Sequence, residues 1–499
     1  MDSRTLFAIL FSLSLTSAAV VPRNNDLTYD VQSGERAPIK GEAPVAVSLE
    51  FFAFPGYVQD LSTTDQCLKN LGDVTGSPTP VRIGGTTQDR ATYDPTLTSA
   101  VDYTVASAGA APATLRYGPS FFDLAGALEG PVTIGVNRRL NNINNSIAAA
   151  KEALQRVPTL YAFELGNEPD LYTKSDPIAG NQTWTPALDA SIQISWQEQV
   201  VPALGLTDDK KEIIQGGPFL QPPKFSIQEL APKEVESGAI QYIKSWADHA
   251  YPQSACGGSK TNLETLQNHT AIVKFVETFR PEVDTAAGLG EGNIRPLIFG
   301  ETNSATCGGG GISPTFGAAL WLLDYTFQSV KLGYERLHFH QGTIGNSPYS
   351  WWGDNHVFAP YYGAYFAASA MGGMDSIVQL DDGQSELAVY AFYKDDQLSR
   401  GAIYNSVFFS NTTAGDRTYQ NFTLTNLPSG TQEISLKRLT APYTTSQQEL
   451  GQAPTFGGQS FADDTCAVQG DEQTEHVEVQ GGSATISVGA SEAVLIYFK

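Results

Sequence analysis

Short apolar stretches recur along the first two thirds of the chain and alternate with longer segments of helical spacing. Residues 146–157 place Ile147, Ala150 and Leu154 on one helical face, and Phe316–Leu332 is dense in apolar residues. Eight stretches have the length and β-rich composition of buried strands: Val45–Phe54, Val81–Gly85, Val132–Asn137, Leu160–Asn167, Ile213–Phe219, Ser245–Tyr251, Pro296–Thr302 and Arg336–Gln341. Strand and helix alternating eight times predicts an α/β fold, a (β/α)₈ barrel.

The pattern changes after about residue 365 to short alternating runs separated by Gly, Asn, Asp and Ser. These runs are Leu387–Tyr393, Arg400–Phe409, Tyr419–Leu424, Glu433–Leu439, Glu475–Val479, Ala484–Val488 and Ala493–Phe498. They predict a C-terminal antiparallel β-sandwich. The segment Leu27–Ala46 is also β-like and is a candidate for an added sandwich strand, while Ala113–Tyr117 is a further stretch that could be counted as a strand.

These patterns divide the chain of 499 residues into four predicted parts. Residues 1–19 contain Arg4, the apolar run Leu6–Leu15 and the small residues Thr16–Ala19, which is the pattern of a secretory signal peptide. Residues 20–44 form the N-terminal segment, residues 45–365 the barrel and residues 366–499 the sandwich. We therefore expect a secreted, extracellular protein. Five glycosylation sequons agree with this route, at Asn144, Asn181, Asn268, Asn411 and Asn421.

Composition excludes several classes of function. The formal net charge is −23, with 53 acidic and 30 basic residues, so binding to nucleic acid is not expected. After the first 19 residues, no stretch has the roughly 20 apolar residues that a membrane helix needs. We expect a monomer without membrane contact. A carboxylate on a substrate would have to be recognised locally, because the acidic surface repels anions at long range.

The four cysteines, at positions 67, 256, 307 and 466, are compatible with two disulfides. Cys256 and Cys307 each follow a candidate strand end, which favours their pairing. Three connectivities remain open at this stage.

Two glutamates close predicted strands of the barrel: Glu168 ends the fourth and Glu301 the seventh. Carboxylates at the carboxyl ends of barrel strands can be held in one concave site, and a pair of them supplies the acid and the nucleophile of glycoside hydrolysis. Asn167, beside Glu168, has an amide that can bind a sugar hydroxyl. No Gly-x-Ser-x-Gly elbow, His-Glu-x-x-His pair or Walker loop is present, and only His338 and His340 are closely spaced. No metal and no cofactor are expected.

Four stretches carry a resemblance to a known family, and they stand in its order and spacing: Ser48–Phe52, Arg82–Asp89, Phe163–Pro169 and Gly300–Gly309. They resemble the family-79 glycoside hydrolases, the β-glucuronidases and heparanase-like enzymes. The tail segments Phe456–Phe461 and Ala490–Ile496 look like the family's C-terminal β-domain. The resemblance implies a retaining exo-β-glucuronidase that acts on carbohydrates bearing β-linked glucuronic acid, 4-O-methylated or not.

Carried over by position, the resemblance gives Glu168 as the acid/base, Glu301 as the nucleophile and Asn167 as the neighbouring amide. It places Glu50 and Asp89 in the sugar pocket. The residue-level alternative for these two is a structural ion pair with Arg82 or Arg90.

One position departs from the family pattern. Glucuronate-specific members have a tyrosine five residues after the nucleophile, followed by glycines that hold the sugar carboxylate, and here Thr306 takes the place of the tyrosine. The glycines remain, as Gly308 and Gly309 with two more, and could form an anion-binding nest. Tyr349 could supply the missing phenol.

The resemblance also matches His249 and Tyr251 to groups that orient the nucleophile. Each of the less specific candidates has a plainer interpretation. His249 could be a hydrogen-bonded core residue, the glycines an ordinary loop and Tyr349 a packing residue. For the whole chain, two alternatives stay open: the same machinery acting on another β-linked sugar, and a non-catalytic carbohydrate-binding protein.

Overall fold

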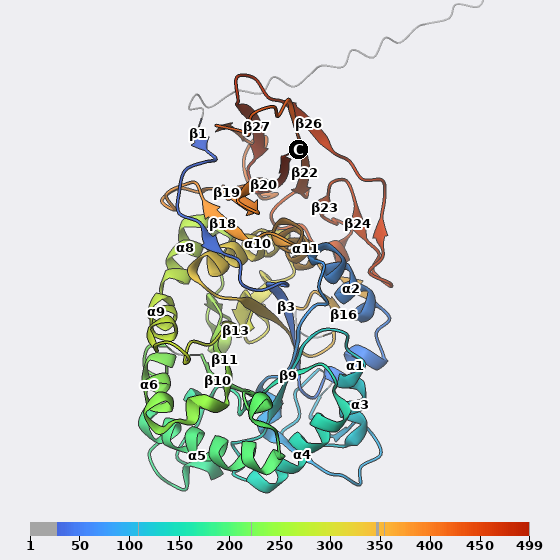
Figure 1. Ribbon diagram of the computed structural model, residues 1–499. Coiled ribbons are helices and arrows are strands. Elements are labelled where there is room, and N and C mark those ends of the chain that lie inside the picture. Colours follow the sequence, from blue (N-terminus) through green and yellow to red (C-terminus); the bar gives the residue numbers. More distant parts are fainter. Residues whose placement is uncertain (1–26, 108, 221, 346–348, 354, 499) are drawn as a thin grey trace, which may run out of the picture.

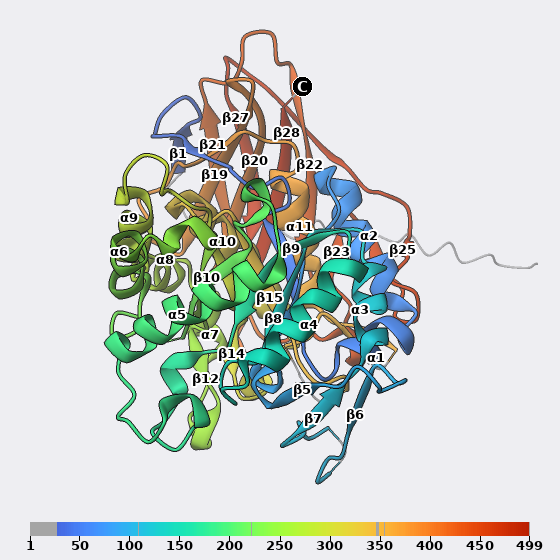
Figure 2. The ribbon, with the colours of Figure 1, turned by 60° about the horizontal axis from the view of Figure 1, so that its bottom comes forward.

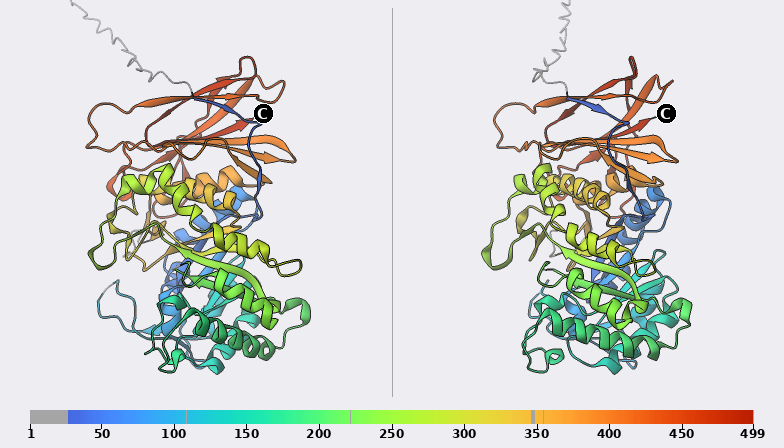
Figure 3. Two further views of the ribbon diagram at one scale, coloured as in Figure 1. Left: turned by 90° about the vertical axis from the view of Figure 1, so that its left-hand side faces the viewer. Right: turned by 60° about the vertical axis from the view of Figure 1, so that its left-hand side comes forward.

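The structure, a computed structural model, describes residues 27–498 with gaps at 108, 221, 346–348 and 354. The predicted signal peptide lies outside the described residues. Two parts stack on each other, the barrel below and the sandwich above, with helices α10 and α11 between them (Figure 1). Two further views show the same layers (Figure 3).

Eight parallel strands close the barrel, and each predicted stretch supplies one of them. Nearly every residue of these strands is buried, because the barrel interior covers one face and the helices the other. The strands are β3 (Val45–Glu50), β4 (Val81–Gly84), β8 (Val132–Val136), β9 (Leu160–Leu165), β10 (Ile214–Phe219), β11 (Ile243–Ala250), β13 (Leu297–Thr302) and β15 (Arg336–Gln341). The predicted α/β barrel is confirmed.

Helices surround the barrel and several begin at a side-chain cap. Thr185 accepts a hydrogen bond from the Leu188 N–H at the start of α5, and Thr315 caps α10 in the same way. The helices are α1 (Phe54–Gln59), α2 (Thr63–Thr75), α3 (Pro119–Gly126), α4 (Ile143–Arg156), α5 (Pro186–Leu204), α6 (Ile227–Ser237), α7 (Leu263–Gln267), α8 (His269–Glu277), α9 (Arg280–Gly288), α10 (Phe316–Leu332) and α11 (Pro360–Met371). Helix α10 is buried almost all round because it lies between barrel and sandwich.

A small three-stranded sheet lies outside the barrel. It joins β5 (Ala91–Tyr93), β7 (Leu115–Tyr117) and β6 (Val101–Tyr103), all within the connection from β4 to α3. Figure 2 shows it projecting beyond the barrel. The extra stretch at residues 113–117 is therefore a strand, but it is not a barrel strand.

The C-terminal part consists of antiparallel sheets, as predicted, except that the N-terminal strand β1 joins β21 in parallel. Its larger sheet follows the order β2-β18-β19-β20-β28-β22-β23, and the smaller one β1-β21-β27. Their strands are β1 (Leu27–Asp30), β2 (Ala37–Pro38), β18 (Ser376–Gln379), β19 (Leu387–Lys394), β20 (Gln397–Asn405), β21 (Tyr419–Thr425), β22 (Glu433–Thr440), β23 (Thr455–Phe456), β26 (Glu475–Glu478), β27 (Ala484–Gly489) and β28 (Glu492–Phe498). A separate core of apolar side chains, including Val389, Ile403, Phe422 and Ile486, fills the sandwich.

The N-terminal segment belongs to the sandwich. Strand β1 pairs with β21 and strand β2 with β18, and Val31 enters the sandwich core. Helix α11 runs through residue 365, the predicted end of the barrel, and the next strand begins at Ser376. We therefore propose that the boundary between the two parts falls after Met371.

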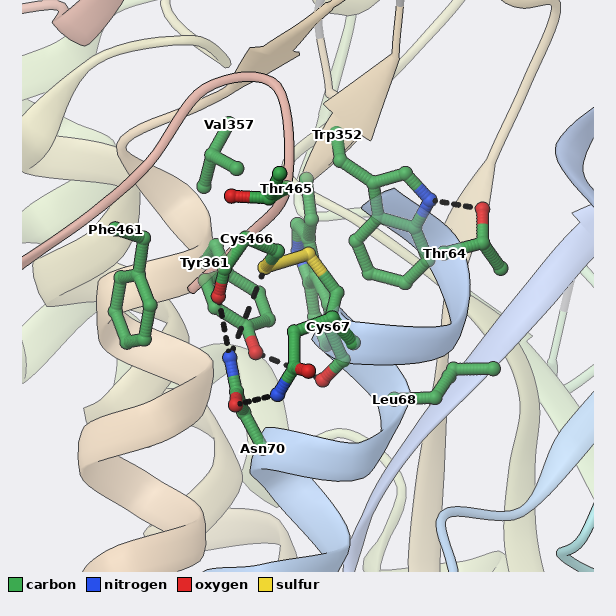
Figure 4. The surroundings of a disulfide bond; sticks show 12 residues. Thr64, Cys67, Leu68, Asn70, Trp352, Val357, Tyr361, Phe461, Thr465 and Cys466 are labelled. Carbon is green, nitrogen blue, oxygen red and sulfur yellow. Dashed lines mark hydrogen bonds between the residues drawn. A yellow bond between two sulfur atoms is a disulfide. The ribbon is translucent and has the colours of Figure 1, made fainter. Parts of the chain in front are cut away.

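Two disulfides pair the four cysteines. Cys256–Cys307 is the favoured pair of the sequence analysis and is confirmed, and Cys67–Cys466 is the other. Cys67 lies in α2 and Cys466 follows β24 (Ser460–Phe461), so this bond fixes the C-terminal part to a barrel helix (Figure 4). Asn70 Nδ2 supports it by donating to the Cys466 carbonyl at 2.7 Å.

Candidate active site

The two predicted carboxylates meet at the carboxyl end of the barrel. Glu168 directly follows the turn after β9, and Glu301 lies in β13. They are 8% and 6% exposed. One carboxylate oxygen of each glutamate and one ring nitrogen of His249 all lie within 4.8 Å of one another. Retaining glycosidases hold their carboxyl groups about 5–5.5 Å apart and inverting ones about 6.5–9.5 Å apart, so this spacing fits the retaining class.

The backbone turn that presents Glu168 is irregular. Glu168 has left-handed dihedrals, φ 44° and ψ 59°, and it precedes Pro169, whose ring further restricts its conformation. Gly166 also has a positive φ, 81°, and a Cβ there would lie 2.4 Å from the Tyr172 hydroxyl. Such strain persists only where surrounding contacts enforce it, and it is concentrated at functional sites.

Glu301 is held by donors on both carboxylate oxygens. Arg82 Nη1 donates to Oε2 at 2.7 Å, and the Tyr251 hydroxyl donates to Oε1 at 2.7 Å. Nδ1 of His340 lies 3.7 Å from Oε2. Burial opposes ionisation, but the positive charges of His340, His249 and Arg82, with the Tyr251 hydrogen bond, hold the pKa of Glu301 well below its ordinary value. This carboxylate is suited to attack as an anion.

Arg82 is the hub of a buried network inside the barrel. Its guanidinium donates to Glu301, to Glu164 through Nε and Nη2, and to Asn167 Oδ1 through Nη2 at 2.9 Å. Gln215 Nε2 also donates to Glu164 at 2.9 Å. Burial disfavours the charge of Arg82, but Glu164 and Glu301 raise its pKa further above the usual value. The planar fork fixes these groups relative to one another.

His249 contacts Glu168, the predicted acid/base. Its Nδ1 lies 3.1 Å from Oε1 of Glu168, whereas Tyr251 hydrogen-bonds Glu301 as expected. His249 is therefore hydrogen-bonded to Glu168 and not to Glu301, and its role in orienting the nucleophile stays a prediction. The register of β11 against β13 shifts between Asp248 and His249, and His249 is paired with Glu301 along the backbone.

Glu50 and Asp89 do not form the ion pairs that were the alternative interpretation. Glu50 accepts from the Thr87 N–H at 3.0 Å and lies 3.3 Å from His340 Nε2. Asp89 accepts from the Asn167 N–H at 2.9 Å and from the Tyr172 hydroxyl. Burial raises the pKa of Asp89, although these hydrogen bonds oppose the change. Asp89 thus supports the turn that carries Asn167.

The glycine loop follows Cys307, whose φ is 54°. Gly308, Gly309, Gly310 and Gly311 all have positive φ, from 56° to 84°, a conformation that favours glycine. A Cβ on Gly309 would lie 3.8 Å from the Tyr349 ring, so the loop and this ring are neighbours. Tyr349 also lies beside His340, with ring centroids 6.0 Å apart. The Thr306 hydroxyl instead donates to Ser254 Oγ at 2.9 Å.

Sequence reasoning missed four residues of this site: Arg82, Glu164, Gln215 and His340. Glu164 lies four residues before Glu168, and His340 is two residues from His338 on β15. Every second residue of a barrel strand points inward, and polar residues at such positions are a usable signal. Without the closed barrel, however, nothing in the sequence says which strands face each other.

Glu168, His249 and Glu301 have ligand atoms close enough to suggest a cation. The Arg82 guanidinium already neutralises Glu301 at 2.7 Å, and Nδ1 of His249 is hydrogen-bonded to Glu168. His338 and His340 also do not share a partner, because His338 Nδ1 faces the Phe299 carbonyl at 3.2 Å. These contacts fit acid–base chemistry better than metal ligation.

A closed barrel with a paired donor and nucleophile at its carboxyl end defines a glycoside hydrolase. Residues 389–495 match the model of the glycosyl hydrolase family 79 C-terminal beta domain. A β-glucuronidase of Aspergillus niger is 30% identical over 457 residues, which cover 82% of this chain and 81% of that protein. A β-glucuronidase of Neurospora crassa is 29% identical over 420 residues, covering 75% and 74%. The chain belongs to glycoside hydrolase family 79.

Solved structures agree with this. A 4-O-α-L-rhamnosyl-β-D-glucuronidase from Fusarium oxysporum, crystallised as its Rha-GlcA complex, is 46% identical with a TM-score of 0.89, covering 94% of this chain and 100% of that one. A family-51 arabinofuranosidase from Xanthomonas axonopodis is 11% identical with a TM-score of 0.62, covering 95% and 100%. The second likeness is one of fold alone. The chain is an enzyme, so the non-catalytic alternative is wrong.

Proposed function

We propose that this chain is a retaining β-glucuronidase that releases β-linked glucuronic acid from the ends of glycans. Glu301 attacks the anomeric carbon and Glu168 protonates the departing oxygen, which leaves a covalent glycosyl-enzyme. Glu168 then deprotonates a water that frees the sugar. The observation that carries this proposal is the carboxylate pair within 4.8 Å, with Glu301 bound by Arg82 and Tyr251.

Recognition of the uronate carboxylate falls to the glycine loop. Backbone N–H groups of Gly308 and Gly309 can approach an anion closely, and the ring of Tyr349 lies beside Gly309. Burying a carboxylate without donors costs several kcal/mol, and a neutral sugar would leave the donors unpaired. Glu50, Asp89, Asn167, His249 and Tyr251 line or support the remaining site.

The test is a comparison of aryl β-glucuronides with aryl β-glucosides at matched leaving groups. We expect kcat/KM to be about 10⁴-fold higher for the glucuronide, because this selectivity arises from unpaired buried donors. Comparable rates would mean that the same machinery acts on another sugar. Retention of the anomeric configuration is tested by proton NMR, which shows whether the sugar first released is the β-anomer.

A second candidate is release of a 4-O-substituted glucuronic acid. It is favoured by the 46% identity with an enzyme described as a 4-O-α-L-rhamnosyl-β-D-glucuronidase. Parallel assays of glucuronides with free, methylated and rhamnosylated O4 separate the candidates. A strong preference for the rhamnosylated substrate would make the enzyme disaccharide-releasing.

Secretion and the monomeric state are also proposals. None of the described helices is long and apolar enough to cross a bilayer. Asn144, Asn181 and Asn411 are exposed, as glycan acceptors must be. Detection of the protein in the culture medium, its mass before and after deglycosylation, and light scattering test these points.

A further inference from the structure

Glu164 is a fully buried carboxylate in the barrel interior that the sequence analysis did not single out. Arg82 binds both of its oxygens, through Nε to Oε2 at 3.1 Å and through Nη2 to Oε1. Gln215 Nε2 donates to Oε2 at 2.9 Å. Its side chain has no exposed surface, so the pair with Arg82 is shielded from water.

The same guanidinium reaches the reacting groups. Its Nη1 donates to Glu301 and its Nη2 to the Oδ1 of Asn167. Because the guanidinium is planar and rigid, fixing its Nε edge on Glu164 fixes the direction of the donors on the other side. Glu164 thereby sets the geometry of the nucleophile without touching the substrate.

Glu164 also acts through charge. Arg82 binds two carboxylates, so its attraction for Glu301 is partly offset by the repulsion between Glu301 and the nearby Glu164. A neutral side chain in place of Glu164 would remove that repulsion. The nucleophile would then be overstabilised as an anion.

A second path from Glu164 runs through His249. Its Nδ1 is bonded to Glu168, and its Nε2 lies 4.0 Å from Glu164 Oε2. Nε2 makes no hydrogen bond to any residue that the structure describes. His249 thus lies between the carboxylate of Glu164 and that of Glu168.

We propose that Glu164 is a positioning residue for glycoside hydrolysis, which through Arg82 aligns Glu301, through His249 orients Glu168, and places a buried negative charge beside the reacting pair. This inference rests on the proposed function, because it takes Glu168 and Glu301 as the reacting pair.

Other titratable groups face the same pair, and their contributions remain in every variant of Glu164. From the elements packed around Glu168, His249 and Glu301 these are Arg82, Asp170, Tyr251, His338, His340 and Tyr349.

The test is Glu164→Gln, which keeps shape and removes charge. The alkaline limb of the kcat/KM profile should move to lower pH by about one unit, because a nearby negative charge is lost. At the pH optimum kcat should fall about tenfold or more with KM within about threefold, since the interaction matters in the transition state. A merely structural residue would not move the limb.

Two further variants make the result specific. Glu164→Asp keeps the charge, so the limb should return to its wild-type position even where kcat stays low. Glu234→Gln is the matched control, because Glu234 is buried on α6, bonded to Gln197 at 2.8 Å. It should leave both the limb and kcat unchanged. A stationary limb in folded Glu164→Gln, or an equal shift in Glu234→Gln, would overturn the inference.

Folding and function are separated by two measurements. If Glu164→Gln fails to fold, Glu164→Asp alone decides: an unchanged kcat overturns the inference. If Glu301→Gln and Glu168→Gln retain wild-type rates, the proposed function itself fails. If those two lose activity while the limb of Glu164→Gln stays in place, only the role of Glu164 fails.

Discussion

Two buried histidines in this molecule each lie between two carboxylates, but only one of them is hydrogen-bonded to both. His269, the first residue of α8, lies between Asp324 and Asp381, with Nδ1 at 2.7 Å and Nε2 at 3.2 Å from their oxygens. His249 lies between Glu168 and Glu164, but only Nδ1 is within hydrogen-bonding distance.

The difference in hydrogen bonding indicates that His269 serves the stability of the fold and His249 the reaction. His269 joins helices of the barrel to the segment after β18 of the sandwich, and both of its nitrogens are satisfied. At His249 one nitrogen is left without a hydrogen bond among the described residues, and its carboxylate neighbours serve the reaction. A buried polar network that is complete rigidifies a fold, whereas an incomplete one leaves a proton free to move.

The largest expected effect lies at the incomplete site. Glu301→Gln should lower kcat/KM by about 10⁴-fold or more on every aryl glucuronide, because the nucleophile is lost. Arg82 keeps Glu164 as its counter-ion, so the unfolding midpoint should stay close to that of the wild type. Activity within tenfold of the wild type would remove Glu301 from its role.

Glu168→Gln should discriminate between leaving groups. A poor leaving group needs its proton, so we expect a loss of about 10³-fold there and less than about tenfold for a good one. A series of aryl glucuronides of graded leaving-group acidity measures this. Equal losses across the series would contradict the assignment of Glu168 as the acid/base.

His249→Gln tests the functional half of the comparison. It should lower kcat about 10²-fold, the scale of a lost acid–base partner, and change the unfolding free energy little. Chemical denaturation and steady-state kinetics on one preparation give both quantities. A large loss of stability with normal kcat would make His249 a second structural histidine.

His269→Gln tests the structural half. Burial opposes protonation of His269, but Asp324 and Asp381 raise its pKa to about 10. The charged form therefore stabilises the fold fully below about pH 6.5, the unfolded value, and this contribution is lost as pH rises through about 10.

We expect the unfolding free energy of the wild type to fall by on the order of 3 kcal/mol over that range, and that of His269→Gln to be lower and nearly flat. Denaturation curves at pH 6, 8 and 10 measure it, with kcat at pH 6 as the control. A wild-type stability independent of pH would refute the ion pair.

The smallest effect concerns the sugar carboxylate. Tyr349→Phe should lower kcat/KM about tenfold on glucuronides and leave the slow turnover of glucosides unchanged, since one hydrogen bond to a charged group is removed. Both substrates are assayed with the same variant. Equal losses on both would return Tyr349 to a packing role.

The barrel was predictable because each parallel strand, buried on both faces, appears as a continuous apolar run. Glu168 and Glu301 were predictable for the same reason, since each ends such a run. The contact between His249 and Glu168 was not, because it joins side chains 81 positions apart that meet only in the folded barrel.

Glu164 and Arg82 show the second limit. They are separated by 82 positions along the chain, and their partnership exists only once the barrel has closed with β4 and β9 on either side of β8. A polar residue within an apolar run indicates a side chain that points into the barrel, but the sequence does not show which residue it contacts there. The boundary at residue 365 stays a prediction; helix α11 runs through it and is buried on nearly every side, so the sequence pattern does not show where the barrel ends.

Strand β1 has a consequence for the order in which the protein is made. Leu27 pairs with Phe422, so the first sandwich strand waits for a partner that leaves the ribosome roughly 400 residues later. At about 5–20 residues per second this is about 20–80 s. Throughout that time the segment before the barrel has an unpaired edge, which is a template for association with other chains. The barrel itself can close earlier, once β15 (Arg336–Gln341) has been made. Synthesis rate, and chaperones that shield this segment, should therefore govern the yield of folded enzyme more than the stability of the finished barrel.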